Sequence, residues 1–131
     1  EELFFRGLIQ RSMLNLSKNV HLSVWITAIL FSAFHMQFYG FIPRVLLGAV
    51  LGYTYVWSGS LWTSVIVHFL NNALVLVLIY MVNTGYLPKE VEQIGMESDK
   101  VTLSWALSSL AMVLGSMFLL YRLKKPVQYV T

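Results

Sequence analysis

The sequence predicts an all-α protein embedded in a membrane, a polytopic bundle of about five transmembrane helices. Of its 131 residues, 57% are hydrophobic and only 11% are charged, whereas soluble domains average about 25% charged residues. No Asp, Glu, Lys or Arg occurs in residues 45–88 or 101–121. Because a bilayer-spanning helix needs about 20 mostly apolar residues, the first stretch can hold two spans and the second can hold one.

The composition also excludes several classes of protein. The formal net charge is +3, but the Lys and Arg residues are scattered and form no basic stripe, so we expect no nucleic-acid partner. Cysteine is absent, which excludes disulfides and thiolate metal sites. Strand-like alternation is missing as well, and within lipid only helices and closed barrels satisfy their backbone polar groups. We therefore predict an integral, multi-pass protein of the cell membrane, in contact with membrane lipid.

Charged residues, glycines and prolines divide the chain into segments. The predicted helices cover residues 1–17, 20–38, 43–57, 61–83 and 101–123. The third helix begins near Pro43, because a proline in the first turn lacks an N–H that would have no partner there. Gly48 and Gly52 lie four residues apart on this helix, a spacing that favours close helix packing.

The remaining segments complete a single membrane-embedded domain over residues 1–131. Residues 84–100 hold four acidic side chains and are expected to form an aqueous loop, and residues 124–131 form a basic tail. The chain opens on Glu1-Glu2 without an initiating methionine. We interpret this opening as the start of a fragment cut from a longer protein, with further helices of the bundle upstream.

Ionisable side chains inside apolar helices are energetically expensive, so they are candidates for a functional site. Glu2 and Arg6 lie four residues apart, a spacing that pairs them on one helix face, while Glu1 points elsewhere. His35 comes near the end of the second predicted helix. His68 and Asn72 are one turn apart on the fourth.

Helix lengths predict that these groups meet. With a rise of about 1.5 Å per residue and antiparallel neighbours, Glu1 and His35 fall at a similar depth. His68 and Asn72 lie within about 10 Å of the turn that follows the second helix. Polar groups from three helices therefore converge in one shallow layer of the bundle.

Two kinds of chemistry fit such a set. A carboxylate beside a histidine in a dry cavity can bind and deprotonate water, while a histidine and an amide can donate hydrogen bonds to a developing oxyanion. Alternatively, two histidines with one or two glutamates could bind Zn²⁺. The spacing is not that of the helical H-E-x-x-H metalloproteases, so the residues alone leave metal-dependent and metal-free water activation open.

Three short motifs resemble those of one known family. E-E-L-F-F-R at residues 1–6 is similar to its EExxxR motif, F-S-A-F-H at 31–35 to FxxxH, and H-F-L-N-N at 68–72 to HxxxN. The family is the CPBP, or Abi, group of intramembrane proteases, which includes type II CAAX prenyl endopeptidases and bacteriocin-processing or self-immunity proteins. Its motifs occur here in the family's order, each on a hydrophobic helix.

The resemblance implies a role for each matching residue. Glu1 is the general base, and His35 helps to hold the attacking water. His68 and Asn72 stabilise the oxyanion, and Glu2 with Arg6 forms a supporting ion pair. No cofactor is favoured, because the partner of His68 is an amide and amides are poor zinc ligands. If one divalent metal such as Zn²⁺ is bound, its ligands are Glu1, His35 and His68.

The expected function is that of an intramembrane endopeptidase that acts on a membrane-associated, prenylated or secreted-peptide substrate. A catalytically silent immunity or regulatory protein that binds a peptide in the same cavity is the alternative. A proton-coupled transporter is disfavoured, because a proton relay should continue across the bilayer. Each residue also has a non-catalytic alternative. Glu1 and Glu2 could simply form a helix N-terminus, where carboxylates are favourable, and His35 could be bonded to a backbone carbonyl. His68 and Asn72 could form interhelical hydrogen bonds, and the Arg6 side chain could snorkel to the headgroups.

Overall fold

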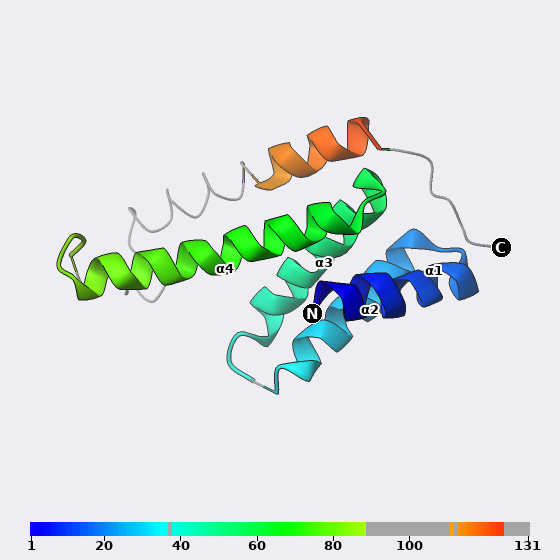
Figure 1. Cartoon of the computed structure of the whole chain (residues 1–131). Coiled ribbons are helices and arrows are strands. Elements are labelled where there is room, and N and C mark those ends of the chain that lie inside the picture. The colour runs from blue at the N-terminus through cyan, green and yellow to red at the C-terminus, as the bar shows by residue number, and fades with distance from the viewer. Residues whose placement is uncertain (37, 89–110, 112, 125–131) are drawn as a thin grey trace. The chain divides into compact units, whose positions relative to one another are not determined.

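A computed structural model describes residues 1–36, 38–88, 111 and 113–124, and in this part of the chain all regular structure is helical (Figure 1). The helices are η1 (Leu3–Gln10), α1 (Arg11–Ser17), α2 (Val20–Phe34), α3 (Phe41–Ser58), α4 (Leu61–Asn83) and a last stretch, Val113–Arg122. The predicted all-α class is confirmed. Two compact units are present, one formed by Glu1–His68 with Leu120–Thr131 and the other by Phe69–Leu119.

The first predicted helix begins with a different hydrogen-bond pattern from the one expected. Its first half, η1, is π-helical, with bonds from residue i to i+5, and α1 follows directly from it. Asn19 caps the next helix, because its side chain accepts a hydrogen bond from the N–H of Leu22 at 3.1 Å. Between the two helices, Lys18 adopts a left-handed conformation with φ +53°. The boundary at Lys18-Asn19 is therefore as predicted. The helix before this boundary is π-helical in its first half and α-helical only in its second.

Helix α2 is four residues shorter than the prediction. It ends at Phe34, and Met36 takes a left-handed conformation with φ +52°, which stops the helix. The hydroxyl of Ser32 donates to the carbonyl of Phe41 at 2.8 Å and ties the turn to the start of α3. His35 consequently lies in the turn after α2, and the prediction that the helix runs to residue 38 is wrong.

Helix α3 begins two residues before the predicted position, after Gly40 with φ +90°, so Pro43 lies in its first turn as expected. It ends at Ser58, and the capping residue Gly59 is left-handed and donates its N–H to the carbonyl of Tyr55 at 3.1 Å. The bounds of α4 match the prediction. Among the described helices, α4 is the one long and apolar enough to cross a membrane, with a mean hydropathy of 2.2, while α2 is apolar but shorter.

Several sequence predictions fall outside the described residues. Of the predicted aqueous loop, residues 84–88 are described and form a turn with Gly85 at φ +80°. Of the predicted last helix, residue 111 and Val113–Arg122 are helical. Most of the loop, the rest of that helix and the basic tail beyond residue 124 lie outside the described part of the chain.

The core of the first unit is built from small and branched apolar side chains between α1, α2 and α3: Leu14, Val24, Ala28, Ala49 and Val56. Gly48 lets α3 approach α2, because a Cβ atom there would lie 3.1 Å from the Cα of Ala28 and 3.2 Å from its Cβ. At Gly52 a Cβ would lie 3.0 Å from Cγ1 of Val24. The predicted close-packing face of the third helix is confirmed.

We expect the Gly48→Ala variant to lower the free energy of unfolding by about 1–3 kcal/mol, because the new methyl group must displace packed backbone and side-chain atoms. Gly115→Ala is the matched control, since nothing lies within 4 Å of a Cβ built at Gly115. This variant should be neutral or up to about 1 kcal/mol more stable. Unfolding in detergent measures both, and equal stabilities of the two variants would contradict the close approach of α2 and α3.

Candidate active site

A stripe of polar side chains runs along η1 and faces α3. Glu2, Arg6 and Gln10 follow one another at intervals of four residues and are buried, with Arg6 and Gln10 fully inaccessible. Arg6 donates from Nη1 to Oε1 of Glu2 at 2.9 Å and from Nη2 to the carbonyl of Gly48 at 3.0 Å. Gln10 donates from Nε2 to the carbonyl of Gly52 at 3.0 Å. Two successive residues of the polar stripe, Arg6 and Gln10, are thus hydrogen-bonded to the carbonyls of the two close-packing glycines, Gly48 and Gly52.

The predicted ion pair of Glu2 with Arg6 is present. Because Arg6 is fully buried, its guanidinium does not extend to a headgroup region, and the snorkelling alternative is wrong. The guanidinium carbon also lies 4.7 Å from the ring centroid of Phe31, a cation–π distance. The positive charge of Arg6 would be very costly to bury alone. It is compensated by the ion pair with Glu2, the hydrogen bond to the carbonyl of Gly48 and the contact with the Phe31 ring.

Glu2 is the centre of the hydrogen-bond network. Besides Arg6, its Oε1 accepts a hydrogen bond from Nδ1 of His68 at 3.0 Å. Its Oε2 accepts a hydrogen bond from the hydroxyl of Ser64. Helix spacing predicts the pairing of Glu2 with Arg6 alone, so the bond to Ser64 was not predicted. The available signal was its spacing, because Ser64 lies four residues before His68 and shares its helix face.

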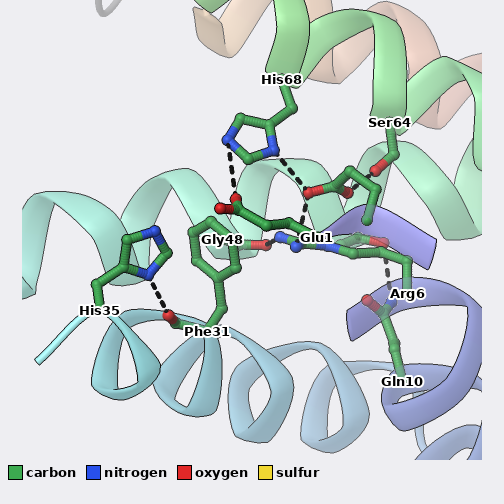
Figure 2. Close-up of polar contacts among 10 residues, drawn as sticks. Glu1, Arg6, Gln10, Phe31, His35, Gly48, Ser64 and His68 are labelled. Carbon is green, nitrogen blue, oxygen red and sulfur yellow. Dashed lines mark hydrogen bonds and ion pairs between the residues drawn. The ribbon is translucent and has the colours of Figure 1, made fainter. Parts of the chain in front are cut away.

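Glu1 lies on the other side of the same imidazole. Its Oε2 is 3.7 Å from Nε2 of His68, and its side chain is 54% exposed, whereas Glu2 is 5% exposed. Glu1 therefore faces Nε2 of His68 (Figure 2), and Glu2 faces Nδ1 of the same ring. One carboxylate is enclosed by protein and the other borders an accessible surface, which is where a substrate or water could approach.

His35 is joined to this network through Phe31. Its Nδ1 lies 2.7 Å from the carbonyl oxygen of Phe31 (Figure 2). Because a carbonyl can only accept, Nδ1 carries the proton and Nε2 is the free acceptor of the neutral ring. The Phe31 ring lies 4.9 Å from the His35 ring and 5.7 Å from the His68 ring. Among the described contacts, no hydrogen bond joins His35 to Glu1 or His68.

Asn72 belongs to the second compact unit. It lies on α4, one turn after His68, and its side chain is exposed. Its amide oxygen accepts a hydrogen bond from Asn71 at 3.4 Å. Asn72 thus lies on the predicted helix, one helical turn after His68 as expected. Its function stays a prediction.

A metal ion was the alternative that the sequence left open. Among the described residues, no group of three or more His, Asp or Glu side chains is close enough to hold one. The alternative zinc set of Glu1, His35 and His68 is therefore not gathered in this arrangement. Both nitrogens of His68 already face carboxylates.

Comparison with known proteins agrees with the three motifs. The family model described as type II CAAX prenyl endopeptidase Rce1-like matches residues 1–74, which include all of the predicted site residues. A curated relative, the uncharacterized protein YpbD of Bacillus subtilis (strain 168), is 29% identical over 77 residues, an alignment that covers 56% of this chain and 36% of the relative. The chain thus spans about a third of the length of this relative. No solved structure is a significant match.

The family match covers more than half of the chain and extends over the whole of the network around Glu2 and His68. Its members are CAAX-type membrane proteases, in agreement with the strongly apolar composition. The chain belongs to the type II CAAX prenyl endopeptidase Rce1-like family.

Proposed function

We propose that this protein hydrolyses a peptide bond near the C-terminus of a membrane-associated substrate, with Glu1 as the general base. The observation that carries the proposal is the position of His68 between an enclosed carboxylate, Glu2, and an accessible one, Glu1. A general base must reach its proton donor directly or through one water. Glu1 has the exposure that this requires, and Glu2 is occupied by three donors.

In this mechanism Glu1 takes a proton from the attacking water while the water oxygen bonds to the scissile carbonyl carbon. The proton then passes to the leaving amine as the tetrahedral intermediate breaks. His35 helps to hold the water through Nε2, the nitrogen left free by its bond to Phe31. No metal is required for these steps, and none is favoured.

His68 and Asn72 would stabilise the developing oxyanion. Because Nδ1 of His68 donates to Glu2, Nε2 is the ring nitrogen that can address a substrate, and it lies on the side of Glu1. When Nε2 carries a proton it can donate to the oxyanion, and the Asn72 amide supplies a second donor. Oxyanion donors are most effective when they are held in place beforehand, as His68 is by Glu2.

The substrate we propose is a prenylated peptide or protein in a cell membrane, which a multi-pass protein of this kind could receive from the lipid. Two features support this proposal. The family description names prenyl endopeptidases, and large apolar side chains of η1 are exposed near the accessible carboxylate, Leu3 and Phe4 among them.

The test is cleavage of a prenylated C-terminal peptide by the purified full-length protein in proteoliposomes, with the unprenylated peptide as control. We expect cleavage of the prenylated peptide, and we expect the rate to be unchanged after treatment with a metal chelator. A rate that falls with chelator and returns with Zn²⁺ would overturn metal-free activation. Binding of the peptide without any cleavage would instead support the silent binding protein.

A further inference from the structure

Ser64 is a fully buried hydroxyl that lies outside the three motifs of the active site. A serine inside a helix can point its hydroxyl to solvent or donate it to the carbonyl four residues earlier. Ser64 instead donates to Oε2 of Glu2, on a different helix (Figure 2). It shares this acceptor group with His68, one turn further along α4. Two side chains of one helix face therefore hold the same carboxylate.

The contribution of Ser64 follows from how the other donors are placed. Arg6 and His68 both bind Oε1 of Glu2. The terminal torsion of a glutamate is broad, with no sharp staggered minima. A carboxylate that is held through one oxygen could therefore turn about this torsion. A donor on Oε2 fixes its plane.

We propose that Ser64 is a positioning residue of the active site, which fixes the plane of Glu2 so that Glu2 in turn fixes the ring of His68. This orientation directs Nε2 of His68 towards Glu1. The inference rests on the proposed peptidase function for its catalytic consequence. The hydrogen-bond link from Ser64 through Glu2 to His68 can be tested without that function.

The first experiment compares Ser64→Thr with Ser64→Val, two variants of nearly the same shape that differ in the hydroxyl. In the proteoliposome assay we expect the Thr variant to keep the kcat of the wild type. The Val variant should lose about ten- to a hundredfold in kcat, the effect of one hydrogen bond to a charged group, with KM unchanged. Thr63→Val, at the neighbouring position of α4, is the control and should leave both constants unchanged.

Equal kcat values for the Thr and Val variants would overturn the proposal, because the hydroxyl would then have no catalytic effect. A loss confined to KM would also overturn it, since Ser64 would then act on substrate binding. A loss in the Thr63→Val control as large as that in Ser64→Val would show that α4 responds to any substitution and would equally contradict the proposal.

The second experiment reads the orientation of His68 directly. In ¹⁵N-histidine NMR spectra of the full-length protein in detergent, the Nδ1–H signal of His68 is assigned by its loss in His68→Gln. We expect this signal at the same position in the wild type and Ser64→Thr, and shifted or broadened by exchange in Ser64→Val. An unchanged signal in Ser64→Val would overturn the link.

The two experiments separate the inference from the function on which it rests. If the wild type does not cleave but the NMR signal responds to the loss of the hydroxyl, the peptidase function fails and the link from Ser64 to His68 stands. If the wild type cleaves while the Thr and Val variants have equal kcat and equal spectra, the inference alone fails.

Discussion

Replacing Glu1 with glutamine is expected to lower kcat for peptide cleavage by about 10²–10⁴-fold, the usual contribution of a general base. Glutamine has almost the shape of glutamate but cannot accept the proton of the attacking water. Because the Glu1 side chain is half exposed and lies 3.7 Å from His68, the substitution should change the free energy of unfolding by less than about 0.5 kcal/mol. Initial rates in proteoliposomes and unfolding in detergent measure the two effects.

A carboxylate of the 84–100 segment provides the control for this experiment. Glu97→Gln makes the same chemical change elsewhere in the chain and should leave kcat unchanged. The assignment of Glu1 would be wrong if Glu1→Gln kept the wild-type kcat, or if its loss of activity were accompanied by a comparable loss of stability.

The Arg6→Met variant should show the largest loss of stability, about 3–5 kcal/mol in the free energy of unfolding. Arg6 is fully buried and binds both Glu2 and the carbonyl of Gly48. Methionine fills part of the volume but removes the counter-charge of the buried Glu2 carboxylate, which keeps only the hydrogen bonds from His68 and Ser64. The measurement is unfolding of the detergent-solubilised protein, with wild type and variant under the same conditions.

The double variant Glu2→Gln/Arg6→Met tests whether the uncompensated charge is the cause. With no buried charge left, part of the lost stability should return, because replacing both members of a buried ion pair costs less than removing one of them. The electrostatic explanation fails if the double variant is no more stable than Arg6→Met.

The helices of this chain could be predicted from apolar stretches and helix breakers, but their ends and hydrogen-bond patterns could not. The bounds of α4 match the prediction because polar turn residues flank a long apolar stretch on both sides. The end of α2 was missed because it depends on a left-handed Met36, and methionine carries no signal for that conformation. The π-helical η1 was missed because apolar side chains are compatible with bonds to i+4 and to i+5.

Residue spacing along the sequence predicts only part of the site. Helix geometry relates residues within one helix, so the pairing of Glu2 with Arg6 could be predicted. Depth arithmetic placed Glu1 level with His35 and put His68 in the same shallow layer, and Glu1 and His68 lie 3.7 Å apart. Depth does not determine how a helix is rotated about its axis. The contact of His35 with Phe31 and the hydrogen bond of Ser64 to Glu2 therefore needed the three-dimensional structure.

The central claim is that two adjacent glutamates have separate tasks, Glu1 in the chemistry and Glu2 in holding the site together. Parallel measurement of kcat and the free energy of unfolding for Glu1→Gln and Glu2→Gln tests this claim most directly. We predict that Glu1→Gln loses activity and keeps its stability. Glu2→Gln, which leaves the buried Arg6 without a counter-charge, should lose stability by several kcal/mol. Similar losses of stability in both variants, or an active Glu1→Gln, would contradict the claim.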